Sequence, residues 1–231
     1  MSGANELTPH KEVPLKGIRK MIAARLGTVW QEAVHVTLHK AVDVTYLYEH
    51  KAELTYSLMD YFLYGLVQTL KTEQFVGFNG HFDGQILRQF TSVNLGIAVD
   101  HPKGLIVPVL HGAEGMELGE FAAKRKELAK RAKDWKQAPQ ELENGTFTMT
   151  NLGTMGIDWF TPILNPPQVA IMGLGRTKVE VTSWSWGDTP RQRALLPLSL
   201  TIDHRVLDGA DAARFLEHVE LCMLELAKSP R

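Results

Sequence analysis

The chain of 231 residues contains a single cysteine, Cys222. One thiol excludes an intramolecular disulfide framework and a zinc site built from cysteines, and it is typical of a reducing compartment. The histidines of the chain show no metal-ligand spacing, so we expect no metal site. Packing is the simplest role for Cys222.

The sequence also lacks a surplus of charge of one sign. It carries 25 basic and 26 acidic side chains, for a formal net charge of −1, so we expect no bulk electrostatic binding to nucleic acid or to an anionic membrane. No run approaches the roughly 18 consecutive apolar residues of a membrane-spanning helix, and the N-terminal segment has no apolar signal core. Together these absences predict a cytoplasmic protein.

The apolar content and its periodicity predict the fold class. Hydrophobic residues make up 44% of the chain, enough for a substantial core. Residues 1–14 are predicted to form an exposed arm, because Gly3, Pro9 and Pro14 interrupt them and no apolar period is present. Strands and helices intermix without a βαβ rhythm, which favours one mixed α/β sandwich domain over residues 15–231. The expected helices are 18–31, 57–71, 117–135 and 210–227, and the expected strands are 35–44, 91–99, 105–110, 146–150, 168–174, 178–184 and 195–202, with a hairpin turn at 82–84.

The sharpest local feature is LPLSLTIDHRVLDGADAARF, from Leu196 to Phe215. A predicted strand runs into Asp203 and His204, and Asp208 opens a helix. A histidine at such a junction is held by a rigid scaffold and can accept a proton near neutral pH, which suits a general base. Asp208 is placed either to orient the loop or to cap the helix. On this pattern alone, a structural histidine and an N-cap aspartate are the simpler interpretation.

A second feature is a threonine-rich strand. Alternation puts the hydroxyls of Thr146, Thr148 and Thr150 on one face, where one of them can stabilise a developing oxyanion, an interaction worth about 2.7–4 kcal/mol when preorganised. The β-propensity of threonine explains the same strand without a function. Further along, Gly173 and Gly175 lack the third glycine of a dinucleotide-binding loop.

Five sequence blocks, taken in chain order, point to one family. The chain resembles, over nearly all of its length, the catalytic domain of the dihydrolipoamide acyltransferases, the core component of 2-oxo acid dehydrogenase complexes. Five blocks in order are far more specific than one motif, and they favour the catalytic interpretation of His204. The blocks are GIRKMIAARL at Gly17–Leu26, HVTLHKAVDVTYL at His35–Leu47, VNLGIAVDHPKGLIVPV at Val93–Val109, NGTFTMTNLGTMGIDWFTPILNPPQVAIMGLGR at Asn144–Arg176, and the block at Leu196–Phe215 quoted above.

The resemblance implies a chloramphenicol-acetyltransferase-like α/β fold assembled as a homotrimer, with each active site in a channel between two subunits. Carried onto this chain, it implies that His204 is the base that takes the thiol proton from coenzyme A or dihydrolipoamide. It also implies that Thr150, from the neighbouring subunit, donates its hydroxyl to the tetrahedral oxyanion. Such chemistry needs neither a metal nor a covalent enzyme intermediate.

The same resemblance implies roles for residues around these two. Asp208 would hold the active-site loop, paired with an arginine from the first helix, for which Arg19 and Arg25 are both candidates. Asn151 and Gly175 fall in blocks that line the coenzyme A path in such proteins.

Two departures from the family pattern concern the ends of the chain. The lipoyl domain and the peripheral-subunit-binding domain that usually precede the catalytic domain are absent from this sequence, so we expect a lipoyl group supplied in trans on a separate carrier, with 2-oxo acid dehydrogenase components as partners. The chain ends at 226–231 without the leucine-rich tail common in the family. We therefore expect a trimer that does not grow into a 24- or 60-subunit cage.

Two alternative functions remain open at this point. A chloramphenicol-type O-acetyltransferase uses the same fold and base, but that group usually has a His-His pair in place of Asp203 and His204. A non-catalytic trimeric scaffold would have no need of His204, Asp208 and Thr150 together. The acyl group also stays open, because one or two methylenes change discrimination by only about 1–3 kcal/mol.

Overall fold

A computed structural model describes residues 10–182 and 189–229. Its strands are β1 (His35–Asp43), β2 (Gly80–Phe82), β3 (Leu87–Gln89), β4 (Leu95–Ile97), β5 (Val109–Leu110), β6 (Phe147–Asn151), β7 (Ala170–Leu174), β8 (Lys178–Thr182) and β9 (Arg191–Asp203). Its α-helices are α1 (Gly17–Glu32), α2 (Thr45–Glu49), α3 (Leu58–Leu70), α4 (Leu118–Lys133) and α5 (Gly209–Lys228). Short 3-10 helices lie at η1 (Glu73–Phe78), η2 (Ala113–Gly115), η3 (Pro139–Leu142) and η4 (Gly153–Met155).

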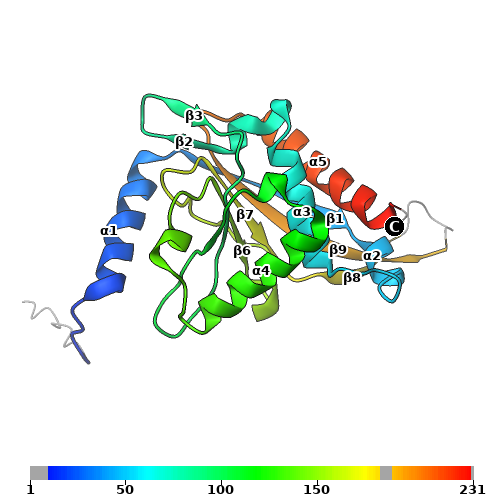
Figure 1. Cartoon of the computed structure of the whole chain (residues 1–231), viewed down its shortest axis with the longest axis horizontal. Coiled ribbons are helices and arrows are strands. Elements are labelled where there is room, and N and C mark those ends of the chain that lie inside the picture. Colours follow the sequence, from blue (N-terminus) through cyan, green and yellow to red (C-terminus); the bar gives the residue numbers. More distant parts are fainter. Residues whose placement is uncertain (1–9, 183–188, 230–231) are drawn as a thin grey trace, which may run out of the picture.

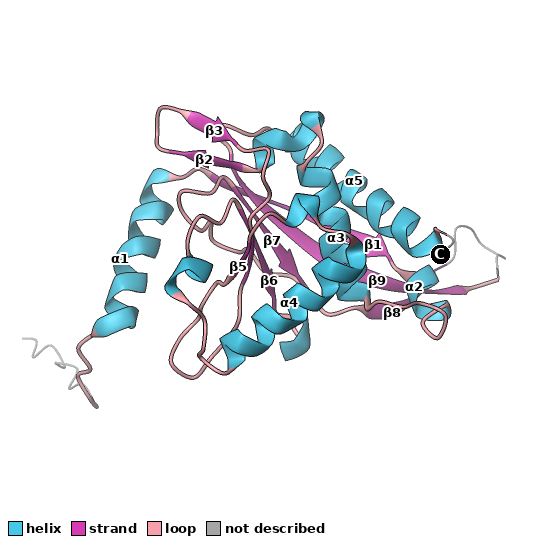
Figure 2. Ribbon diagram, in the orientation of Figure 1, coloured by secondary structure: helices cyan, strands magenta, loops and turns pink. Residues whose placement is uncertain are grey.

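The strands form one large mixed sheet and a small hairpin. Within the described residues the large sheet has seven strands, in the order β1-β9-β7-β6-β4-β5 with β8 pairing with β9, and β2 pairs with β3 separately. Helices α3, α4 and α5 pack on one face of the large sheet, whereas α1 projects along the edge of the molecule (Figures 1 and 2). This arrangement confirms the predicted mixed α/β sandwich.

The longest strand, β9, is buried on both of its faces over its second half. Aliphatic side chains at alternate positions from Leu196 to Ile202 face the helices in the main core. Ser199 and Thr201, on the opposite face, are buried as well, and Thr201 Oγ1 lies 2.7 Å from Thr37 Oγ1 of β1. Burial on both faces fixes the end of the strand, where His204 follows.

The predicted helices are confirmed to within two residues at each end as α1, α3, α4 and α5. Periodicity identifies α3, α4 and α5 because each buries one apolar stripe, whereas the apolar side chains of α1 stay largely exposed in this chain. Strand β9 begins four residues earlier than predicted, since its first residues, Arg191–Leu195, pair with β8, whereas β1 pairs with Leu195–Asp203. Strand β8 is described to Thr182, and the predicted strand residues 183–184 lie outside the described residues, as do residues 1–9 of the predicted arm.

The strands predicted at 91–99 and 105–110 are too long. Only Leu95–Ile97 and Val109–Leu110 form strands, with one isolated bridge between Val99 and Ile106. The side chain of Asn94 bonds to the backbone of two loops, donating to the Asn144 carbonyl and accepting from the Gly112 N–H. These loop contacts end the hydrogen-bond ladder of β4 before Leu95. Pro108, the residue before β5, has no N–H with which to extend that strand.

Helix α2 is missing from the predicted elements. The Asp43 carboxylate accepts hydrogen bonds from Thr45 N at 3.0 Å and from Thr45 Oγ1. This local bonding forms a turn after β1, and the five-residue helix begins there. Such a short helix shows no apolar period from which to predict it.

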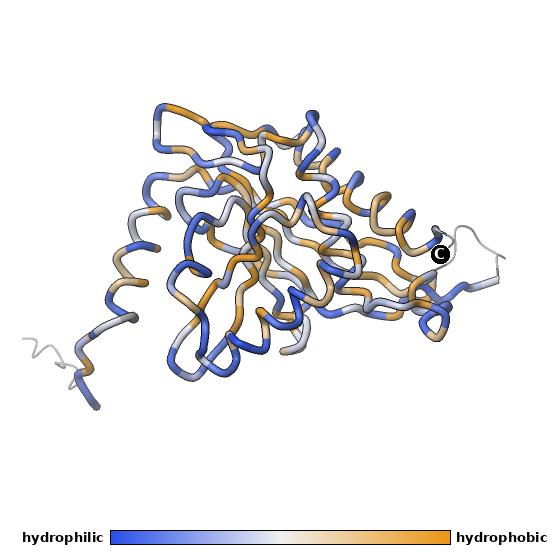
Figure 3. Tube along the Cα trace, viewed as in Figure 1, coloured by the Kyte–Doolittle hydropathy of each residue, from blue (hydrophilic) through white to orange (hydrophobic). Residues whose placement is uncertain are grey.

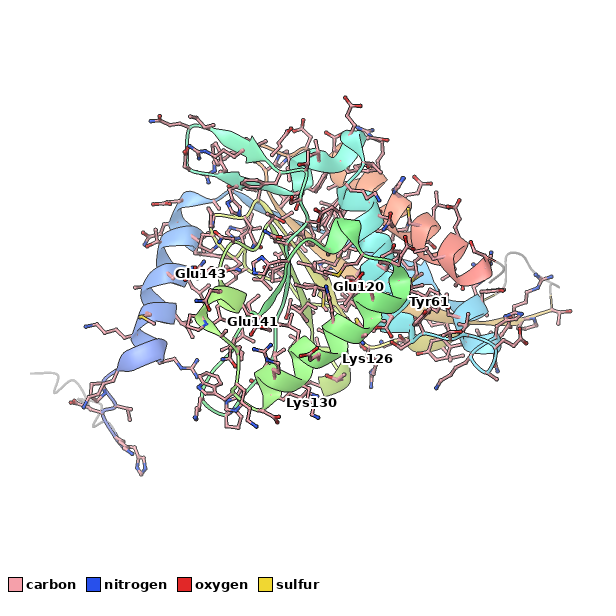
Figure 4. The ribbon with its side chains drawn as sticks, viewed as in Figure 1. Tyr61, Glu120, Lys126, Lys130, Glu141 and Glu143 are labelled. Atoms are coloured by element: carbon pink, nitrogen blue, oxygen red, sulfur yellow. The ribbon has the colours of Figure 1, made fainter. Side chains whose placement is uncertain are left out.

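A buried ion pair joins α3 to α4. Asp60 is fully buried in the first turn of α3, where it forms a capping box with Ser57, and its Oδ1 accepts a 2.7 Å hydrogen bond from Arg125 Nε of α4. Burial raises the pKa of the Asp60 carboxyl, but the hydrogen bonds from Ser57 and Arg125 outweigh burial and lower that pKa overall. The exposed Lys126, labelled on α4 in Figure 4, lies farther away, at 3.7 Å.

Replacing Arg125 by alanine is expected to lower the free energy of unfolding by about 3 kcal/mol, because it leaves the buried carboxylate without its partner. A carboxyl whose pKa is lowered on folding stabilises the protein above its unfolded pKa, and that stability is lost as the pH falls through the folded pKa. The parent should therefore lose stability below about pH 4, and Arg125→Ala should show a shallower loss. Urea unfolding from pH 7 to pH 3 measures both effects. Lys126→Ala is the control, expected within about 0.5 kcal/mol of the parent; equal effects of the two substitutions would contradict the assignment.

Helix α1 has little contact with the rest of its own chain. Val29 is buried in a small cluster with Leu164 and Ile171, and the Arg25 guanidinium donates to the Pro166 carbonyl. Other apolar side chains of α1 point outward: Met21 is 65% exposed and Trp30 is 59% exposed. Hydrophobic stretches are visible on α1 as well as in the central strands in Figure 3. Across the described residues, no helix has the length and apolarity needed to cross a bilayer.

Candidate active site

His204 is the first residue after β9. Its backbone N–H donates a 2.8 Å hydrogen bond to the Val34 carbonyl, which ties the loop to the start of β1. The N–H groups of Val206 and Leu207 both donate to the Asp203 carbonyl at 3.1 Å, and buried Leu207 anchors the end of this turn. The backbone is therefore held on both sides of the imidazole. The His204 side chain itself is 40% exposed, so it can meet a substrate.

Asp208 stands at the N-cap position of α5. Its side chain makes no cap hydrogen bond, so of the two alternatives left open by the sequence the helix cap is excluded. The carboxylate lies instead on the side of His204, with Oδ1 at 3.7 Å from His204 Nδ1, and it is 80% exposed. At this distance the two side chains are neighbours that form no hydrogen bond with each other. In the described structure neither Arg19 nor Arg25 pairs with Asp208, and Arg25 donates to the Pro166 carbonyl.

Thr146, Thr148 and Thr150 differ in how their hydroxyls are used. Buried Thr146 contacts the backbone of Asn94, and buried Thr148 donates to Gln168 Oε1 at 2.6 Å. Thr150 is half-buried, and its hydroxyl makes no hydrogen bond within the described part of the chain. It is therefore the one hydroxyl of the three that remains available to an oxyanion.

Asn151 and Gly175 lie beside Thr150 at the ends of β6 and β7. Asn151 Oδ1 accepts a 2.8 Å hydrogen bond from Gly153 N, which shapes the turn after β6. Gly175 is buried, and a Cβ at its position would lie 1.8 Å from the Asp158 carbonyl oxygen. Close backbone packing thus accounts for the glycine. Contact of either residue with coenzyme A stays a prediction.

Strand register places His204 and Thr150 far apart within one chain. Thr150 pairs with Gly173 of β7, and Gly173 pairs with Ser199 of β9. His204 follows Ser199 by five residues, about 17 Å along the strand, and Thr150 lies two strands, about 10 Å, to the side. A separation of roughly 20 Å cannot place both groups on one thioester. A site that uses both must combine two copies of the chain.

Comparison with known proteins places this chain in a family. The family model of the 2-oxoacid dehydrogenases acyltransferase (catalytic domain) matches residues 8–229. The chain belongs to this family. The predicted resemblance is therefore confirmed, and the simpler interpretation of the Leu196–Phe215 block as purely structural loses its advantage.

Relatives of this acyltransferase domain carry consistent names. The dihydrolipoyllysine-residue acetyltransferase component of the pyruvate dehydrogenase complex of Mycoplasma capricolum is 35% identical over 218 residues, which cover 90% of this chain and 49% of that protein. The chain spans between about a third and just over half of the curated relatives it matches.

Solved structures share the fold. A probable dihydrolipoamide acetyltransferase from Listeria monocytogenes superposes with a TM-score of 0.85 at 29% identity, covering 96% of this chain and 97% of that one. Azotobacter vinelandii dihydrolipoamide acetyltransferase, studied for the roles of a serine, a histidine and an asparagine in its mechanism, gives 0.83 at 31% identity, covering 94% and 93%. A chloramphenicol acetyltransferase, at 12% identity and 0.53, confirms the predicted fold class and no more.

Proposed function

We propose that this acyltransferase domain moves an acyl group between the thiol of a dihydrolipoyl carrier and the thiol of coenzyme A. The observation that carries the proposal is the family match over residues 8–229 together with the exposed imidazole of His204 held at the end of β9. The catalytic residues of the proposal are His204, Asp208 and Thr150. The relatives are named for acetyl transfer to a dihydrolipoyllysine residue, which favours acetyl as the group transferred.

The proposed chemistry begins with His204 taking the proton of the attacking thiol. The thiol has a pKa of about 8.5, so a neighbouring imidazole suffices to generate the thiolate. The thiolate forms a C–S bond with the thioester carbonyl carbon, and the carbonyl oxygen becomes an oxyanion that accepts a hydrogen bond from Thr150. When the intermediate collapses, the other C–S bond breaks, and the leaving thiolate receives the proton from His204. Asp208 stabilises the imidazolium in between.

The proposed assembly is a homotrimer in which His204 of one protomer faces Thr150 of the next. Two observations support it. The first is the separation of roughly 20 Å between the His204 imidazole and the Thr150 hydroxyl within one chain. A site built from a single protomer would therefore contain only one of these two groups. The second is the exposed apolar surface of Met21 and Trp30 on α1 and of Met155 and Trp159 after β6. Exposed apolar surface of this kind marks a protein interface, and a second copy is the partner that the incomplete site requires.

The substrates and their carrier follow from the same proposal. Coenzyme A is one substrate, and the predicted contacts of Asn151 and Gly175 with it belong to the proposal. The dihydrolipoyl group is supplied by a lipoylated carrier domain or protein of a 2-oxo acid dehydrogenase complex.

In the Azotobacter protein, the histidine and asparagine studied for the mechanism are four residues apart, the spacing of His204 and Asp208. The single thiol of Cys222 supports a reducing, cytoplasmic compartment.

An assay of the purified protein with acetyl-CoA tests the proposed function. Dihydrolipoamide is expected to be acetylated and chloramphenicol is not, because the channel must accept a thiol on a long flexible arm. Chromatographic separation of free coenzyme A from acetyl-CoA and mass measurement of the acceptor give the two readouts. Acetylation of chloramphenicol alone would replace the proposal with the hydroxyl-directed alternative. No turnover of either acceptor by an intact oligomer would favour the non-catalytic scaffold.

A further inference from the structure

The two charged residues that flank His204 form an ion pair with each other. Arg205 Nη2 donates to Asp203 Oδ2 at 2.6 Å, and Arg205 Nε donates to Asp203 Oδ1 at 2.9 Å. This is the paired geometry in which the planar fork of an arginine fits a carboxylate. The sequence singled out Asp203 and His204 as neighbours, but it gave no role to Arg205.

The carboxylate of this pair is deeply placed. Asp203 is only 3% exposed, and its Oδ1 also accepts hydrogen bonds from the backbone N–H of Arg205 at 3.1 Å and of Val34 at 3.4 Å. Burial raises the pKa of the Asp203 carboxyl, but the bonds from Arg205 outweigh burial, so that pKa lies below its usual value. The carboxylate is therefore charged at neutral pH and depends on Arg205 as its cationic partner.

The pair also joins three elements around the imidazole. Asp203 ends β9 and holds Val34 before β1, and the His204 N–H donates to the carbonyl of the same Val34. The Arg205 guanidinium carbon lies 4.8 Å from the ring centroid of Phe82 in β2. The loop that carries His204 is thus fixed against β1, β9 and the β2–β3 hairpin. The side chains of His204 and Asp208 take no part in these contacts, and they are 40% and 80% exposed.

We propose that Asp203 and Arg205 are positioning residues that hold the backbone of His204 so that its imidazole meets the substrate thiol. This inference rests on the proposed role of His204 as the base. A displacement of about 1 Å at a reacting group can cost about 100-fold in rate. Loss of the Asp203–Arg205 pair, which we call the clamp, is therefore expected to slow the chemical step without removing any contact to coenzyme A.

Arg205→Ala tests the proposal, with steady-state kinetics in acetyl-CoA and dihydrolipoamide. The expected result is a kcat lowered by about 10- to 100-fold with the KM for acetyl-CoA changed by less than about twofold, and partial recovery of kcat when guanidinium ion is added. Arg205→Lys keeps a point charge but cannot bond to both carboxylate oxygens, so an intermediate kcat is expected. Arg214→Ala is the matched control, since it breaks an exposed arginine–aspartate pair with Asp211 one turn into α5 and should leave kcat unchanged.

Several results would overturn this inference. An unchanged kcat in Arg205→Ala would do so, and so would a raised KM at full kcat, which would make Arg205 a substrate contact. If Arg205→Ala fails to assemble, Arg205→Lys decides by the same two readouts. His204→Ala, measured alongside, separates this inference from the proposed function. Full turnover in His204→Ala would reject both the proposed role of His204 and the positioning role of Asp203 and Arg205. If His204→Ala is inactive but Arg205→Ala has parental kinetics, only the positioning role is rejected.

Discussion

Replacing His204 by alanine is expected to lower kcat by about 10²- to 10⁴-fold while leaving the fold and the oligomer intact. The side chain is 40% exposed at the end of a strand that is buried on both faces, so its removal opens no cavity in the core. The loss falls on proton transfer from the thiol, and KM for either substrate should change little. Acetyl transfer to dihydrolipoamide at neutral pH measures the effect.

The pH dependence of the same variant gives an independent check. Raising the pH supplies thiolate without a base, so His204→Ala should recover part of its rate between about pH 8 and pH 9.5, near and above the thiol pKa of about 8.5. His111→Ala is the control, because His111 lies on the surface, with Nε2 3.2 Å from the Gln140 carbonyl. Turnover in His204→Ala equal to that of His111→Ala would show that another group is the base.

Mixing two inactive variants is expected to restore activity, which is the most direct test of a site shared between protomers. Thr150→Ala alone should lower kcat by about 10²- to 10³-fold, because it removes the donor to the oxyanion. Thr150→Ser keeps the hydroxyl and should retain most of the rate. Each homotrimer of His204→Ala or Thr150→Ala then lacks one group at every site.

In a mixed trimer, the protomer with intact His204 can face the protomer with intact Thr150. Random assembly from equal amounts gives an intact pair at about a quarter of the sites, so the mixture should reach about a quarter of the parental rate after joint refolding. A double variant, His204→Ala with Thr150→Ala, mixed with either single variant should give no recovery. If both groups came from one chain, every site would carry a lesion, and the mixture would stay as slow as its components.

The elements of the fold were largely predictable because their signals are local. Four helices were predicted from apolar residues recurring at a period of 3.6, and α3, α4 and α5 bury the stripe that this period creates. The errors arose where bonding to distant residues sets an end. Asn94 engages loops at Asn144 and Gly112, and β9 gains four residues because β8 lies beside it.

The candidate site was predictable in part. The block around His204 and the strand carrying Thr150 both lie within the residues that match the acyltransferase family, while the roles of the two side chains stay predictions. The sequence left open whether Asp208 caps the helix or orients the loop, and the structure excludes the cap, because the direction of an exposed side chain depends on its neighbours in space. Arg205 had no role in the sequence interpretation, since its contact with Phe82 and the bond between its partner Asp203 and Val34 involve residues far away in the chain.

The mixed α/β architecture and the family were readable from the sequence alone, and so were His204 and Thr150 as the candidate base and oxyanion donor. The tertiary structure decided that Thr146 and Thr148 use their hydroxyls inside the fold while Thr150 does not, and that Asp203 and Arg205 clamp the loop. It also decided that Thr150 and His204 of one chain lie at different ends of the sheet. The physical reason is that periodicity records only which neighbours along the chain share a face, whereas strand register and burial record which distant residues meet.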